Sequence, residues 1–174
     1  MKITSLWIVK AAGAVFALAA ANPAAAEWIS GKDEEGLPFA YVVNESRNLF
    51  GQWCNKEVDA CFWVLATQRG CETGSDVPGV INTEKGSAAI SMQCLATTTL
   101  DGKLYHRLVL SPFDTVRTAL QGQKRIALAM PMQDVSFAVL RFNTTGADAA
   151  IGRMESAVRI YFNTNKKSTK DQSL

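Results

Sequence analysis

Short apolar runs, each ended by glycine or by polar turn residues, fill most of the chain between residues 39 and 142. Their alternating, β-branched and aromatic character suits a pleated sheet. They predict strands at 39–43, 49–54, 61–67, 88–94, 104–110, 125–130 and 135–142. Glycine and aspartate in 31–36, 101–102 and 121–124 supply the backbone conformations of tight turns. Short strands at this spacing predict an antiparallel β-sandwich or a barrel-like sheet.

The apolar period changes after Gly146. Apolar residues then fall three and four positions apart, at Ala147, Ala150, Ile151, Met154 and Val158, which is the spacing of one helix face. We therefore predict a helix over 146–157, with the hydroxyl of Thr144 or Thr145 as its cap. Residues 158–162 (VRIYF) either extend this helix or form a last strand. One C-terminal helix packed on an antiparallel sheet predicts an α+β fold that is mostly β.

The first 26 residues have the organisation of a secretory signal peptide. Lys2 and Lys10 make the start basic, an uncharged apolar run follows over 11–21, and Ala24-Ala25-Ala26 ends it with small residues. The apolar run is too short to cross a bilayer, and no longer one follows. We expect cleavage before Glu27, no stable membrane insertion, and a periplasmic or secreted product.

The exported chain is predicted to be one domain with a neutral overall charge. Without Lys2 and Lys10, the 18 basic residues fall to 16 and equal the 16 acidic ones. Nucleic-acid binding is therefore not expected, since it needs a basic surface. The one dense basic cluster belongs to 164–174, a Ser/Thr/Lys-rich stretch predicted to be a flexible tail. The folded domain is predicted to span 27–163.

The four cysteines, Cys54, Cys61, Cys71 and Cys94, predict two disulfides, because an even count in an exported protein reads as a disulfide framework. Zinc ligands would lie closer in sequence, and a redox motif would show C-x-x-C. We expect no metal and no cofactor. The pairing Cys54–Cys61 with Cys71–Cys94 is favoured, since 49–54 and 61–67 can form a hairpin. The alternative is Cys54–Cys94 with Cys61–Cys71.

Catalytic groups are sparse. His106 is the single histidine of the chain and shares a strand face with apolar residues, where a packed role is commoner than a catalytic one. Asp114, Ser91 and Ser111 are its conceivable partners, but none stands in a recognised motif. The carboxylates at 33–35 are read as a solvated turn. The aromatic residues Trp53, Phe62, Trp63 and Phe137 are expected to fill the core rather than to bind carbohydrate.

The C-terminal third resembles a known family. An early tryptophan (Trp28), cysteines on β-like runs, and the segments IALAMP at 126–131, FAVLRF at 137–142 and GADAAI at 146–151 carry the likeness. Together they resemble small proteobacterial periplasmic proteins of the invasion-associated locus B type. The resemblance implies a β-rich exported protein with no enzymatic activity and an association with host cells. It assigns no functional residue.

We therefore expect a non-catalytic binding protein of the bacterial envelope with a protein partner and a virulence-associated or inhibitor-like role. The polar loop with Asn55, Lys56, Glu57 and Asp59 is the candidate contact surface, together with the stretch from Gly70 to Ser87. The alternative function is an envelope hydrolase that uses His106.

Overall fold

The computed structural model describes residues 27–100, 102–132 and 136–170. In this part of the chain one antiparallel sheet of nine strands has the order β1-β2-β3-β4-β7-β6-β5-β8-β9. The elements are β1 (Ile29–Lys32), β2 (Pro38–Val43), β3 (Leu49–Asn55), β4 (Ala60–Thr67), β5 (Asp76–Thr83), β6 (Gly86–Leu100), β7 (Lys103–Ser111), α1 (Phe113–Leu120), β8 (Arg125–Pro131), β9 (Phe137–Asn143) and α2 (Ala147–Lys170). The predicted mostly β, antiparallel fold with a C-terminal helix is confirmed.

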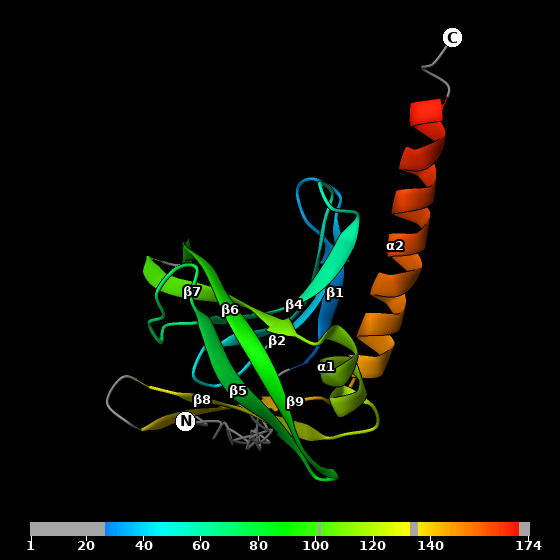
Figure 1. The fold of residues 1–174 in the computed structure, drawn as a ribbon. Helices are drawn as coiled ribbons and strands as arrows, with labels where there is room; N and C mark the ends of the chain where they lie inside the picture. Colours follow the sequence, from blue (N-terminus) through cyan, green and yellow to red (C-terminus); the bar gives the residue numbers. More distant parts are fainter. Residues whose placement is uncertain (1–26, 101, 133–135, 171–174) are drawn as a thin grey trace, which may run out of the picture.

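The sheet curls until its two ends meet at one corner (Figure 1). There the indole Nε1 of Trp28 donates to the carbonyl of Asn143 at 2.9 Å, and the Asn44 side-chain amide donates to the carbonyl of Arg141 at 3.1 Å. No strand pairing joins β1 to β9 in the described residues, so the sheet is barrel-like but open. Two separate sheets, as a sandwich requires, are not present in this part of the chain.

The inner face of the curled sheet holds the hydrophobic core. Trp63 is fully buried at its centre, and its ring stacks on that of Phe50 with 5.4 Å between centroids. Side chains of α1 and α2, including Val116, Leu120 and Met154, complete the same core. Both helices therefore cover the inner side of the sheet.

The expectation that four aromatic residues fill the core is correct for Trp63 and wrong for Phe137. Buried and exposed positions alternate along β9, with Ala138 and Leu140 inside, so Phe137 points outward and is 69% exposed. Trp53 and Phe62 lie half-buried, opposite each other on the outer face of β3 and β4.

Three elements were missing from the sequence prediction: β1, β5 and α1. Pro78 and Gly79 lie inside β5, within the stretch from Gly70 to Ser87 that we expected to be a contact surface. Pro78 is tolerated because β8 pairs with β5 only from Val80 onward, so no ladder bond to β8 is lost there. The strand predicted at 135–142 begins at Phe137 in the structure, and residues 133–135 lie outside the described part.

The C-terminal helix is longer than predicted. α2 runs from Ala147 to Lys170, so 158–162 extend the helix, and 164–170, which we assigned to a flexible tail, continue it. Residues 171–174 and the predicted signal peptide lie outside the described residues. Of the two residues predicted to cap this helix, Thr144 and Thr145, Thr144 uses its hydroxyl to donate to the carbonyl of Gln123 at 2.6 Å. No helix in the described residues has the length and apolar content that crossing a membrane requires.

Candidate functional site

The predicted contact loop is the turn of the β3–β4 hairpin. Cys54 faces Cys61 in the strand register, and the two form a disulfide at the base of the turn. The side chain of Asn55 accepts a hydrogen bond from the Glu57 backbone N–H at 2.7 Å, which shapes the loop from within. Residues 55–59 are all exposed, and Val58 at the tip is 58% exposed. The loop is thus exposed, and a hydrogen bond and a disulfide constrain its conformation.

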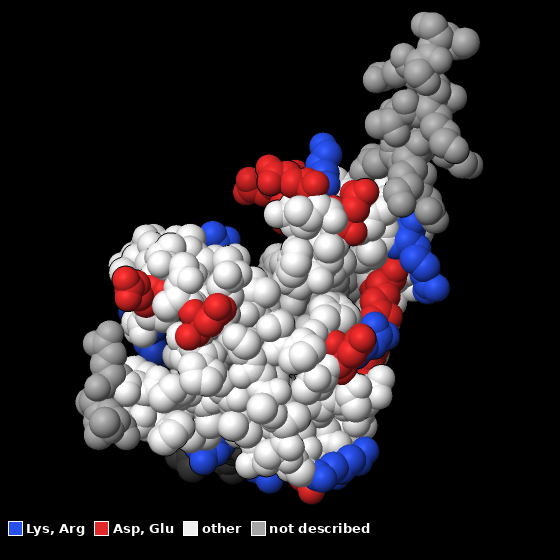
Figure 2. Space-filling model, in the orientation of Figure 1, with Lys and Arg blue, Asp and Glu red and all other residues white. Residues whose placement is uncertain are grey.

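A second acidic turn lies beside it. β2 pairs with β3, and Phe39 near the start of β2 lies opposite Trp53 near the end of β3. The β1–β2 turn and the β3–β4 turn therefore lie side by side at the same end of these strands. We name the two turns together the acidic tip, which comprises Lys32, Asp33, Glu34, Glu35, Lys56, Glu57 and Asp59. Figure 2 shows acidic side chains gathered at this upper end of the molecule, where Figure 1 draws the two turns.

One carboxylate of the acidic tip has a local structural role. Asp33 accepts hydrogen bonds from the backbone N–H groups of Glu35 and Leu37, at 3.0 and 2.8 Å, and so closes its own turn. The interpretation of 33–35 as a solvated turn agrees with this geometry. The side chains of Glu34, Glu35, Glu57 and Asp59 are exposed at the same end.

The second predicted contact stretch, 70–87, is not one loop. Residues 76–83 form β5 inside the sheet, which leaves 68–75 and the β5–β6 turn at 84–85 as connecting segments. The 68–75 segment is attached to β6 by the disulfide between Cys71 and Cys94. Both disulfides therefore have the pairing that we favoured from the sequence, and the described cysteines include no free thiol.

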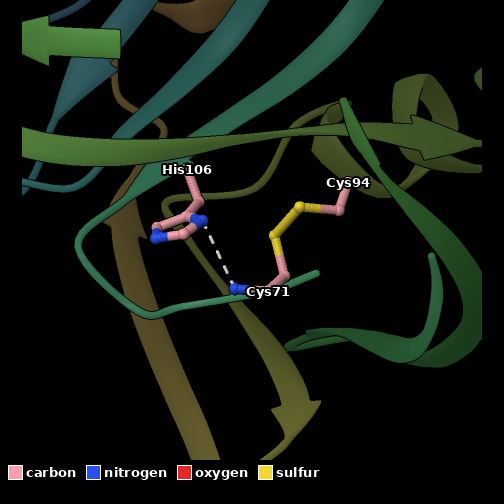
Figure 3. A group of neighbouring side chains, drawn as sticks. All are labelled: Cys71, Cys94 and His106. Atoms are coloured by element: carbon pink, nitrogen blue, oxygen red, sulfur yellow. Dashed lines mark hydrogen bonds between the residues drawn. A yellow bond between two sulfur atoms is a disulfide. The ribbon is translucent and has the colours of Figure 1, made fainter. Parts of the chain in front are cut away.

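His106 lies next to this second disulfide (Figure 3). The backbone N–H of Cys71 donates to Nδ1 of His106 at 3.4 Å. Potential ligand atoms of Cys71, Cys94 and His106 all lie within 4.8 Å of one another. Cys94 is fully buried, whereas Cys71 and His106 are half-buried. His106 lies 12 or more positions from every cysteine in the chain, so their spacing was no reason to group them.

The residues considered as hydrolase partners of His106 are not brought to it. Ser91 pairs with Ser111, five residues from His106 along β7, or about 17 Å of extended strand. Asp114 lies in α1 and lines an open hollow of about 490 Å³ between that helix and the β5–β6 hairpin. Lys85, Thr83 and Thr118 also line this hollow. In the described residues, neither site pairs a nucleophile with a base, as hydrolysis by a serine or cysteine nucleophile requires.

The outer aromatic residues of β2 and β3 pack on one another. The rings of Tyr41 and Trp53 stack at 5.5 Å with 16° between their planes, and Phe39 stacks on Trp53 at 6.3 Å. These contacts join the outer faces of β2 and β3.

Comparison with known proteins gives one informative result. No family model matches the chain, and no curated protein is similar to it. A solved structure, invasion associated protein B from Bartonella henselae, matches with a TM-score of 0.52 and 17% identity, over 76% of this chain and 94% of that one. The chain shares that protein's fold. The sequence resemblance is thereby confirmed at the level of the fold, and it extends beyond the C-terminal third in which it was first recognised.

Two disulfides and this fold likeness fit an extracytoplasmic location, because disulfides persist in oxidising compartments. The likeness by itself assigns no site residue and no activity.

Proposed function

We propose that this protein is an exported, non-catalytic binding protein of the bacterial envelope, periplasmic or secreted and virulence-associated, which contacts a protein partner. The signal peptide read from residues 1–26 directs export, and the two disulfides suit the oxidising compartment beyond the inner membrane. The fold likeness to an invasion associated protein supports a role at the surface that meets a host.

The acidic tip is the observation that carries the proposal. It places five carboxylates against two lysines on two adjacent turns, so it presents a net negative surface. The disulfide and the Asn55 hydrogen bond hold the β3–β4 turn in shape before any partner arrives, which reduces the entropy lost on binding. Exposed Val58 adds an apolar contact at its centre. Such a surface attracts a basic patch on a protein and steers its approach.

The test reverses charge at the tip and at a matched place elsewhere. Glu57→Lys with Asp59→Lys changes the net charge by the same amount as Glu45→Lys with Glu84→Lys, which alters exposed residues outside the tip. Proteins captured by the exported chain from envelope and host-membrane extracts are identified, purified and titrated against each variant. We expect the tip variant to weaken binding more than about tenfold, which corresponds to about 1.4 kcal/mol, and the control variant to bind like the parent chain.

Salt supplies a second readout. Binding of the parent chain should weaken as ionic strength rises, because exposed charges are screened. A purified partner that binds the tip variant and the parent equally would contradict the assignment of the tip. Repeated failure to capture a discrete partner from both extracts would contradict the binding function itself.

A further inference from the structure

The cluster of Cys71, Cys94 and His106 combines a disulfide with a histidine that serves no catalytic arrangement in the described residues. We propose that it is a redox-gated metal site: when the Cys71–Cys94 bond is reduced, the two thiolates and the His106 imidazole bind a borderline or soft cation such as Zn²⁺. This site is separate from the acidic tip, and its existence does not depend on the proposed partner.

The geometry suits such an ion. With Zn–S bonds of about 2.3 Å and a Zn–N bond of about 2.0 Å, a tetrahedral zinc places its sulfur and nitrogen ligands about 3.5–3.8 Å apart. The three ligand atoms already lie within 4.8 Å of one another, so local side-chain movement is enough once the sulfurs separate. Two thiolates and one imidazole are the ligand types that zinc prefers, and water from the exposed side supplies the fourth.

His106 turns one ring nitrogen toward the cluster. Its Nδ1 accepts a hydrogen bond from the Cys71 N–H, so this is the nitrogen whose lone pair would bind the ion. The accepted bond is long, at 3.4 Å, and is a weak competitor for the lone pair. The residue is held between β4 and β6, where it faces Thr67 and Thr97 in the strand register.

The disulfide is not the sole link between the 68–75 segment, which carries Cys71, and β6, which carries Cys94. The Gly74 N–H donates to the carbonyl of Cys94 at 2.7 Å, and the Cys94 N–H donates to the carbonyl of Ser75 at 2.9 Å. These bonds keep the 68–75 segment beside β6 after the sulfur bond opens. Cys71 and His106 are half-buried, which leaves a path for the ion, whereas Cys94 anchors the site in the core.

The chemical step is balanced by a dithiol reductant. Two electrons and two protons pass to the sulfurs of Cys71 and Cys94, and the dithiol leaves as its own disulfide. Binding of the cation then displaces both thiol protons to solvent. Reoxidation by a small-molecule disulfide, which takes up the two electrons and two protons and leaves as a dithiol, expels the ion and restores the closed form.

The experiment uses the exported chain with Cys54→Ser and Cys61→Ser, so that one cysteine pair remains. After reduction and removal of the reductant without oxygen, Co²⁺ is titrated in and the thiolate-to-cobalt charge-transfer absorption is followed. We expect one equivalent of Co²⁺ to bind and Zn²⁺ to displace it, while the oxidised protein binds neither. Adding His106→Ala should weaken Zn²⁺ binding more than about tenfold, since even changes to residues that only orient the ligands of a zinc ion reach that size.

Two results on the folded protein would overturn the site. One is a folded, reduced protein, as judged by circular dichroism, that shows no charge-transfer band. The other is unchanged zinc affinity in the His106→Ala variant. If the reduced chain loses its fold without metal, Zn²⁺ should restore the circular dichroism spectrum, because binding energy adds to folding energy; failure to restore it also refutes the proposal. Partner binding at the tip is measured separately on the oxidised chain.

Discussion

The same amino acid has opposite roles at two positions of this protein. Gly51 lies on β3 directly opposite Tyr41, and a Cβ atom there would lie 2.2 Å from the Ala40 carbonyl oxygen and 2.5 Å from the Tyr41 Cα. Its missing side chain lets the Tyr41 and Trp53 rings stack across the outer face. Gly152, on the exposed side of α2, has no neighbouring heavy atom within 4 Å of such a Cβ.

Alanine substitution should separate these two roles. Gly51→Ala is expected to lower the free energy of unfolding by about 3 kcal/mol or more, because backbone atoms opposite it leave no room to adjust. Gly152→Ala is expected to raise that free energy by about 0.5–1 kcal/mol, since alanine loses less backbone entropy than glycine in a helix. Urea unfolding of the oxidised protein measures both. A neutral Gly51→Ala would show that β2 and β3 separate more easily than their register implies.

The size of the Gly51 effect was not readable from the local sequence. Gly51 stands inside an apolar strand pattern and Gly152 inside a helical one. The pattern alone predicts that glycine makes the fold modestly less stable than alanine would at each position. At Gly51 the effect depends on the backbone atoms of β2 that lie close to it. The Cys54–Cys61 disulfide was easier to predict. It depends only on where two neighbouring strands end and on the short loop between them.

Among the larger elements, the two disulfides constrain different parts of the fold. Cys54–Cys61 joins the ends of two strands that already pair, across seven positions of sequence. Cys71–Cys94 spans 23 positions and attaches the 68–75 segment to β6. In the chain-entropy description, the longer loop loses more freedom in the unfolded state when it is closed.

We therefore expect unequal costs when each bond is removed. Replacing Cys71 and Cys94 by alanine should lower the free energy of unfolding by about 1 kcal/mol more than the same change at Cys54 and Cys61. Denaturant titrations of the two double variants, with the parent chain beside them, give the difference. A larger loss at Cys54 and Cys61 would mean that the β3–β4 hairpin depends on its disulfide more than on its strand pairing.

Elements with strong periodicity were predicted, and those with weak periodicity were missed. The α2 face was recognised from Ala147, Ala150, Ile151 and Met154, all of which are buried. The length of α2 was not, because the β-branched and aromatic residues at 158–162 suit a strand equally well, whereas the structure continues the helix through them. α1 is eight residues long and gives too short a pattern to stand out.

At the scale of the whole molecule, Trp28 links the two ends of the curled sheet. Its ring is 3% exposed, packs edge-on against Phe50 with 6.1 Å between centroids, and donates to the Asn143 carbonyl after β9. β1 and β9 are the edge strands of the sheet order. The residue that follows the expected N-terminus thus contributes to the overall shape.

Trp28→Ala should lower the free energy of unfolding by about 3–5 kcal/mol, because it removes a large buried ring. Trp28→Phe keeps most of the apolar contact but loses the hydrogen bond, so we expect a loss of about 1–2 kcal/mol. Thermal and urea unfolding, with amide exchange of β9 as a local probe, would check this. Equal effects of the two substitutions would show that the hydrogen bond, and not the buried ring, holds the corner.

The linear pattern of this chain was enough for its class, for the favoured cysteine pairing and for the first turns of its C-terminal helix, because each depends on neighbours within one or two elements. The pattern did not predict that β7 lies between β4 and β6 in the sheet, so that β4 does not pair with the strand that follows it in the chain. That placement brings His106 to Cys71 and Cys94, and the pairing of β2 with β3 brings the two acidic turns together. Both candidate sites therefore come from long-range strand pairing, which the core selects as a whole and no local segment encodes.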